Sequence, residues 1–118
     1  GHTVGSENIF RKGFLEHKED IRRAIEELDY FSDPEALEKE EELKGMGIAC
    51  DAVILLAARY ERLATEMAED CRDERRRQEL LQIAQNCRQV PAHRPETYWQ
   101  AIQMYWFVHL AVTTELNP

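Results

Sequence analysis

The sequence predicts an all-α fold, an antiparallel bundle of four to five helices that forms one helical domain over residues 1–118. Apolar residues recur at steps of three and four along almost the whole chain, a spacing that places them on one face of a helix. The chain has only five Gly and four Pro, too few for the many tight turns of a β-sandwich or barrel. Apolar residues make up 43% of the chain, enough to build a core.

Charge and cysteine usage exclude several functional classes. The 15 Lys and Arg against 23 Asp and Glu give a net charge of −8, the wrong sign for a general nucleic-acid or anionic-membrane binder, so neither partner is expected. Cys50, Cys71 and Cys87 include no CxxC pair, which argues against a disulfide framework or a zinc ribbon and favours the reducing cytoplasm. The most apolar stretch, 98–112, is interrupted by Gln100, Gln103 and His109, and the longest unbroken apolar run inside it, 104–108, is far shorter than the ~20 residues of a membrane span.

The first helix is expected to begin at Ser6 or Asn8, either of which can cap it, and to end around 30–31. Gly13 lies inside this segment, where it weakens a helix by ~1 kcal/mol relative to Ala and can permit a close approach. The apolar face of the segment consists of Phe10, Phe14, Ile21, Ala24, Ile25 and Leu28.

Asp33-Pro34 predicts the next helix start, because a capping side chain precedes a proline at the first helical position. Glutamates crowd the turns that follow and predict a solvated surface. The expected break or kink is Gly45-Met46-Gly47, so that 34–44 and 47–71 form either two helices or one bent helix. The apolar stripe beyond the glycines consists of Ile48, Ala52, Leu55, Leu56, Tyr60, Leu63, Met67 and Cys71.

A further helix is predicted to begin at the cap Asp73 and to end at Val90, since a residue before proline is pushed out of the helical region. A stiff connector then covers 90–95, and Pro95 and Glu96 open the last helix. That helix is apolar on most of its circumference, which is typical of a buried helix. Burying it on every side needs more neighbours than three amphipathic helices provide.

The residues predict no complete active site. No histidine follows the Glu-x-x-His pattern of di-iron bundles and no HExxH occurs, so we expect no metal site. His109 is predicted to be a core histidine with a hydrogen-bond partner. None of the three cysteines lies in the electropositive setting that a reactive thiolate needs, so no catalytic residue is predicted.

Several stretches of the chain together are similar to a known family. They are VPAHRPETYWQAIQMYWFVHL over 90–110, TTELNP over 113–118, RYERLA over 59–64 ahead of the Leu-Leu-x-Ile-Ala-x-x-Cys run over 80–87, and GHT over 1–3 ahead of RKG over 11–13. The sequence resembles the glycyl radical enzyme family, in the branch that holds pyruvate formate-lyase-like dehydratases, decarboxylases and lyases. The resemblance covers essentially all 118 residues.

The resemblance implies a parent enzyme several times longer, a ten-stranded α/β barrel surrounded by helices, of which this chain is one helical segment. In that family a radical on a C-terminal glycine passes to a loop cysteine, and the resulting thiyl radical abstracts hydrogen from a small molecule that is then cleaved or dehydrated. A radical-SAM activating enzyme installs the glycyl radical. This chain lacks the Cys-x-Glu loop and the Arg-Val-x-Gly-Tyr-like motif, so it is expected to be inactive alone and to hold no cofactor.

The resemblance also assigns expectations to the two ends of the chain. A histidine at the place of His2 binds a substrate hydroxyl in polyol-dehydrating relatives, which makes His2 a substrate-binding candidate, although Gly1-His2 is equally consistent with the remnant of a cleaved tag. The remainder of the parent barrel is the expected partner of the last helix, so the isolated chain should self-associate through it. The alternative is a free-standing interaction module whose aromatic face binds a partner helix. The sequence leaves the substrate and the oligomeric state open.

Overall fold

The computed structural model describes residues 8–115, and all regular elements within that range are helical. This confirms the predicted all-α class for the described part of the chain. The elements are α1 (Asn8–Arg11), α2 (Phe14–Glu26), α3 (Ala36–Asp70), α4 (Glu74–Gln89), α5 (Tyr98–Leu110) and the π-helical turn η1 (Ala111–Glu115).

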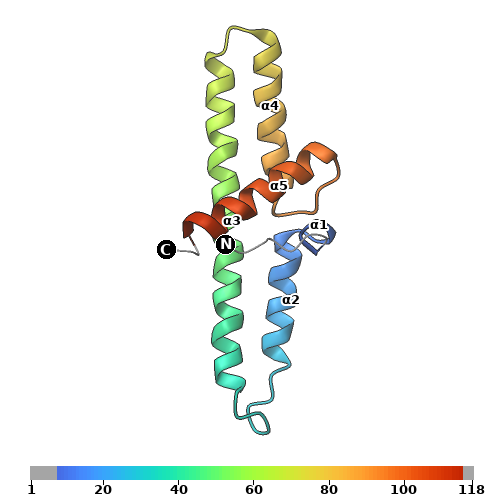
Figure 1. Ribbon diagram of the computed structural model, residues 1–118, viewed down its shortest axis with the longest axis vertical. Helices are drawn as coiled ribbons and strands as arrows, with labels where there is room; N and C mark the ends of the chain where they lie inside the picture. The colour runs from blue at the N-terminus through green and yellow to red at the C-terminus, as the bar shows by residue number, and fades with distance from the viewer. Residues whose placement is uncertain (1–7, 116–118) are drawn as a thin grey trace.

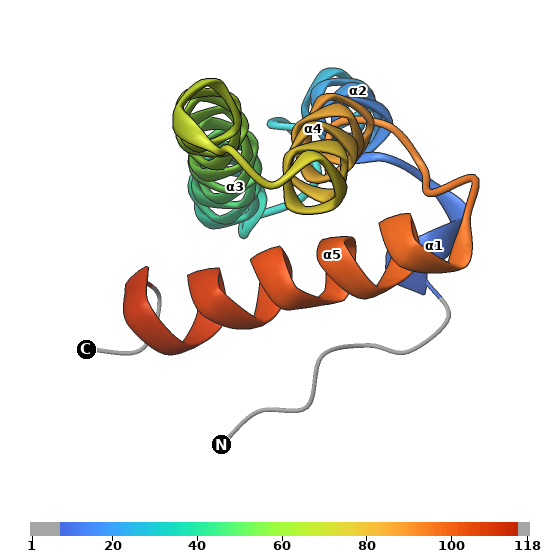
Figure 2. The same ribbon diagram turned by 90° about the horizontal axis from the view of Figure 1, so that it is seen from above.

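The long helix α3 is the spine of the molecule (Figure 1). Its 35 residues span about 52 Å at 1.5 Å per residue, most of the 63 Å longest dimension. α2 packs antiparallel along its N-terminal half and α4 along its C-terminal half, while α5 crosses near the middle (Figures 1 and 2). The helices pack in antiparallel pairs as predicted, but they do not form one bundle: α2 and α4 follow each other along α3, which has buried positions from Ala36 to Ala68 (Figure 1).

The expected break at Gly45-Met46-Gly47 does not occur, since α3 runs through it as one α-helix. A Cβ atom added at Gly45 or Gly47 would meet nothing within 4 Å, so these glycines serve no close approach. Each costs the helix about 1 kcal/mol relative to Ala. The packing of α2 along this half of α3 offsets that cost.

The first predicted helix is divided in two, because the chain leaves the helical path at Lys12 and Gly13 and resumes at Phe14. The backbone N–H of Phe14 donates to the Pro91 carbonyl at 2.7 Å, and that of Leu15 donates to the Ala92 carbonyl at 3.0 Å. A continuous helix would turn these two N–H groups toward its own preceding turn. The start of α2 is therefore hydrogen-bonded to the backbone of the connector after α4.

Gly13 makes this docking possible. A Cβ atom at this position would lie 2.2 Å from the Ala92 carbonyl oxygen and 2.3 Å from the His93 Cα, so no other residue fits without moving backbone. The glycine has φ −77°, which any residue can adopt. Close approach, and not an unusual backbone conformation, is therefore the reason for glycine here.

α2 ends at Glu26, earlier than the predicted 30–31. The Asp29 carboxylate accepts the backbone N–H groups of Phe31 at 3.0 Å and Ser32 at 3.1 Å, and so folds the chain into a turn. These bonds favour the ionised form and lower the pKa of Asp29. Asp33 accepts the Glu35 N–H at 2.9 Å, but it is not the predicted cap: α3 begins at Ala36, and its N-cap residue is Glu35, which makes no side-chain cap hydrogen bond.

The predicted limits of α4 are confirmed: Asp73 accepts the Arg75 N–H at 3.1 Å, and the helix ends before the cis Val90–Pro91 bond. The last helix begins later than expected. Thr97, and not Pro95 or Glu96, caps α5 by accepting the Gln100 N–H at 3.1 Å. The Gln100 side chain in turn accepts the Glu96 N–H at 2.7 Å and holds that residue outside the helix.

A chain of side-chain amides joins α4 to α5. Asn86 is almost fully buried, and its Nδ2 donates to Oε1 of Gln103 at 2.7 Å while its Oδ1 accepts from Gln82 at 2.8 Å. Beside it lies the apolar core at the crossing, where α5 meets α3 and α4. The core consists of Val53, Ala57, Cys87, Phe107 and Ala111.

We predict that Gly13→Ala destabilises the fold by about 1–3 kcal/mol, because the added methyl group must displace the connector backbone. The matched control is Gly45→Ala, which meets no neighbour and should stabilise α3 by roughly 0.5–1 kcal/mol. Urea unfolding followed by circular dichroism measures both changes. Equal effects of the two substitutions would contradict the assigned role of Gly13.

Candidate functional site

One side of α5 forms an exposed aromatic surface, which we call the α5 outer face. Tyr98 is 82% exposed and Trp106 is 57% exposed. The helix contains no Asp, Glu, Lys or Arg. A contiguous uncharged patch of this kind typically marks an interaction surface. The face consists of Tyr98, Ile102, Tyr105, Trp106 and His109.

The expectation that α5 is a buried helix is met on one side only. Figure 2 shows α5 lying across one side of the α3 and α4 pair, so those helices cover only the half that faces them. The buried residues on that half include Gln100, Met104, Phe107 and Val108. The described elements thus do not cover the outer half, consistent with the inference that three amphipathic helices cannot bury this helix on every side.

His109 belongs to this surface and not to the core, contrary to the prediction. Its ring is half-buried and lies nearly parallel to the Trp106 ring, with centroids 5.5 Å apart and 3° between the planes. The Tyr105 ring lies 6.2 Å away at 10°. Residues three and four positions apart share a helix face, so this stack stiffens the aromatic surface.

A small apolar pocket opens beside the α5 outer face, where α5 crosses α3 and α4. Its volume is about 230 Å³. Trp99 and Trp106, the two tryptophans of the chain, both line it, and Cys87 and Gln103 lie against its buried side. We call it the tryptophan pocket. It is lined by Tyr60, Ile83, Cys87, Trp99, Gln103, Trp106, Phe107 and Leu110.

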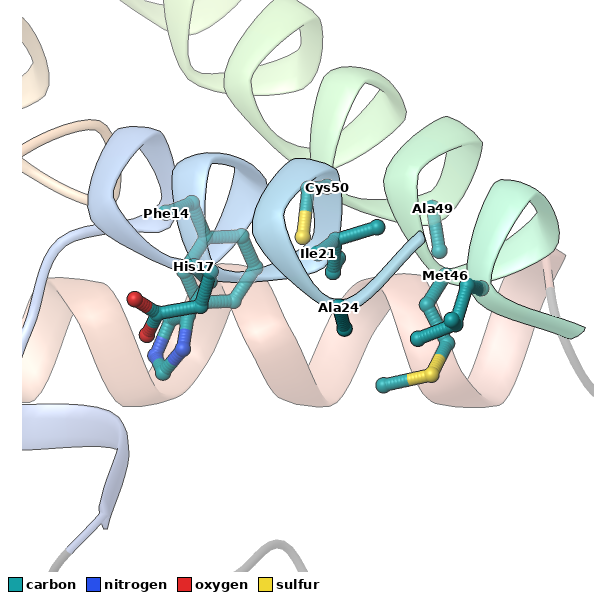
Figure 3. Close-up of a pocket in the computed structure, with 9 residues that line it drawn as sticks. Phe14, His17, Ile21, Ala24, Met46, Ala49 and Cys50 are labelled. Carbon is teal, nitrogen blue, oxygen red and sulfur yellow. The ribbon is translucent and has the colours of Figure 1, made fainter. Parts of the chain in front are cut away.

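A larger groove of about 510 Å³ lies between α2 and α3 (Figure 3). Figure 3 shows Ile21, Met46 and Cys50 among its mostly apolar walls, with His17 and Phe14 at one end. The Asp20 carboxylate in this groove is held by Lys12 at 2.6 Å, which lowers its pKa. This ion pair leaves the groove without an unpaired charge among its described residues.

The two inner cysteines are poorly suited to nucleophilic chemistry. Burial raises the pKa of the Cys87 thiol to about 11, and burial together with the Asp51 carboxylate raises the pKa of Cys50. A thiol in this state carries little thiolate near neutral pH.

Residues 8–115 contain no cluster of three or more His, Cys, Asp or Glu side chains able to hold a metal ion. They also do not fit a radical site of their own. Gly45 and Gly47 lie within α3 and Gly13 is buried against the connector, so none of the three sits at a loop tip beside a cysteine. The substrate-binding candidate His2 lies outside the described residues.

The sequence interpretation missed both the docking of Gly13 on the connector and the amide chain through Asn86. A glycine inside a helical pattern was a signal for the first. No local signal points to the second, because the partner of Asn86 is 17 residues away on another helix. The exposed half of α5 was indicated by its composition.

Within residues 8–115, no helix combines the length and apolarity needed to cross a bilayer.

We predict that Cys87 alkylates slowly in the folded chain. At pH 8, a pKa of about 11 instead of 9.0 gives a thiolate fraction about a hundredfold lower, and the rate should rise as pH approaches 11. Iodoacetamide labelling followed by peptide mass spectrometry measures this rate. The control is the same thiol in urea, and equal rates in both conditions would show that Cys87 is not protected.

Comparisons with known proteins show that the chain is similar to one part of several larger enzymes. The family model described as Pyruvate formate lyase-like matches residues 1–118. The chain is 54% identical to trans-4-hydroxy-L-proline dehydratase of Clostridioides difficile over 117 residues, which are 99% of this chain and 15% of that enzyme. It is 38% identical to isethionate sulfite-lyase of Desulfovibrio desulfuricans over 88% of this chain and 12% of that enzyme.

Solved structures agree with the sequence matches. Hydroxyproline dehydratase from Clostridioides difficile, with trans-4-hydroxy-L-proline bound, superimposes with a TM-score of 0.92 at 53% identity, over 98% of this chain and 15% of that one. A glycyl radical enzyme from Archaeoglobus fulgidus gives a TM-score of 0.84 at 39% identity, again over 98% and 15%. The chain therefore spans about one seventh of the length of these relatives, and it belongs to the Pyruvate formate lyase-like family of glycyl radical enzymes.

Proposed function

We propose that this chain serves as a helical segment of a longer glycyl radical enzyme, which dehydrates a small molecule or cleaves its C–C or C–heteroatom bond by a radical route. The α5 outer face carries the proposal. It is uncharged and half-exposed, and it lies in a chain that covers 15% of the length of its relative trans-4-hydroxy-L-proline dehydratase. The dehydratase and lyase activities named for the relatives support the reaction class.

The remainder of the parent barrel is the proposed partner of the α5 outer face. The distribution of charge supports this orientation. Residues 26–42, at the α2–α3 turn, hold nine acidic residues and one basic residue, a net charge of −8 that equals the net charge of the whole chain. A strongly acidic end favours solvent, whereas an uncharged aromatic face favours burial.

In this proposal the chain is catalytically inactive on its own. Burial raises the pKa of Cys50 and of Cys87, so both thiols are protonated near neutral pH. The described glycines do not fit a radical site. The glycyl radical and the loop cysteine would reside in the remainder of the parent, and a radical-SAM activating enzyme would act there. His2 is retained as a candidate contact to a substrate hydroxyl, which His2→Ala in the longer enzyme would test through kcat/KM.

A free-standing interaction module is the second candidate, and the same exposed face favours it. An amphipathic partner helix could lie on Tyr98, Ile102 and Trp106, which an isolated chain leaves in solvent. The two candidates differ in what covers the face: the same polypeptide in the first, a separate protein in the second.

The reading frame tests the proposed function. Sequencing the gene on both sides of this segment should reveal several hundred further codons, including the Cys-x-Glu loop and the Arg-Val-x-Gly-Tyr-like motif. An immunoblot of the source cells should show a correspondingly longer product. A stop codon directly after Pro118 together with a short product would reject the proposal and favour the interaction module.

We predict that the isolated chain self-associates through the α5 outer face. Sedimentation at tens of micromolar should show dimers or larger species, and Ile102→Lys should shift them to monomer, since a charge in the patch must stay in water. The matched control is Leu37→Lys, a 68% exposed position near the acidic turn, which should leave the distribution unchanged. A monomeric wild-type chain at high concentration would contradict the prediction.

A further inference from the structure

The lining of the tryptophan pocket is mainly apolar and carries no charged side chain. No Asp, Glu, Lys, Arg or His lines it. The polar side chain on its buried side is already engaged: Gln103 Oε1 accepts from Asn86 at 2.7 Å, and Gln103 Nε2 donates to the Cys87 sulfur at 3.7 Å. A charged group placed here would lose its hydration and meet no side chain of opposite charge. The lining therefore selects an apolar occupant.

The size of the pocket limits that occupant to one side chain. Its volume of about 230 Å³ exceeds the ~150 Å³ cavity that accepts benzene and falls below the ~300 Å³ at which pockets for drug-sized ligands begin. A single branched or aromatic side chain matches this range. Interfaces commonly gain much of their binding energy from one such anchor in a desolvated pocket.

The position of the pocket indicates where this side chain comes from. Trp106 contributes both to the pocket and to the α5 outer face, so a body that covers the face also covers the mouth of the pocket. The relatives have more than six times the length of this chain, so a body large enough to cover the face is available in enzymes of this family.

We propose that the tryptophan pocket is the socket for one apolar side chain of the remainder of the longer enzyme, and that this side chain anchors the barrel on α5. The inference rests on the proposed function, because the occupant belongs to the same polypeptide. The proposed function states only that the barrel covers the α5 outer face. This inference adds the position, between Trp99 and Trp106, at which one side chain anchors it.

Hydroxyl-radical footprinting with mass spectrometry tests whether the pocket is occupied. The experiment compares the 118-residue chain, at low micromolar concentration, with the full-length enzyme encoded by the longer reading frame. Oxidation of Trp99 and Trp106 should fall by about fivefold or more in the longer enzyme, because an anchored pocket excludes water. Phe31, which is fully exposed at the distant α2–α3 turn, is the internal control and should react equally in both.

A filled-pocket variant gives a second measurement. In the longer enzyme, Ile83→Phe should occupy the socket from the α4 side and displace the anchor, so that limited proteolysis separates this segment from the rest several-fold faster. Ile48→Phe makes the same change at a 69% exposed site on α3 and should have no effect. Circular dichroism of each variant chain verifies that its helices form, and equal proteolysis of the two variants would count against the socket.

The remaining outcomes separate this inference from the proposed function. If the longer frame exists and Tyr98 is protected while Trp99 stays reactive, the face is covered, the pocket is empty, and the inference is wrong although the proposed function stands. If the isolated chain protects both tryptophans as its concentration rises, to the level seen in the longer enzyme, a second copy fills the pocket and the inference is again overturned. Absence of a longer frame rejects both proposals.

Discussion

The backbone contact between the start of α2 and the connector after α4 is the constraint on which the arrangement of the helices depends. Two N–H groups of the first turn of α2 bind the carbonyls of Pro91 and Ala92, and Gly13 is the residue that lets the two backbones come this close. Through this contact the connector sets where α2 begins, beside the point from which the chain departs toward α5. The α2–α3 hairpin and the α3–α4 hairpin are thereby held in one orientation relative to each other.

The second determinant is the way α5 is attached. Its inner half combines apolar packing around Phe107 with a fully paired amide chain through Asn86 and Gln103. Buried amides tolerate only arrangements in which their hydrogen bonds are made, so they fix the position of α5 more narrowly than apolar contacts alone. A precisely held helix with an uncovered aromatic half is suited to receive a larger body.

The arrangement of the helices is consistent with the chain's membership in the glycyl radical enzyme family. The features of the described residues are those of a support: a long spine, an acidic end and an uncharged face, with inner thiols kept protonated by burial. Under the proposed function, this segment would support the barrel and the radical chemistry would reside in the remainder of the enzyme.

The sequence by itself determined the helical class, the cap at Asp73, the end of α4 before Pro91 and the excess apolarity of the last helix, because each follows from local backbone chemistry or from periodicity. It also carried the family resemblance. Only the tertiary structure decided that α1 and α2 are separate, that α3 continues through its glycines, and that the hairpins are arranged in series along one spine. These features depend on contacts between segments far apart in the chain, such as Gly13 with His93 or Asn86 with Gln103, and no local pattern records them.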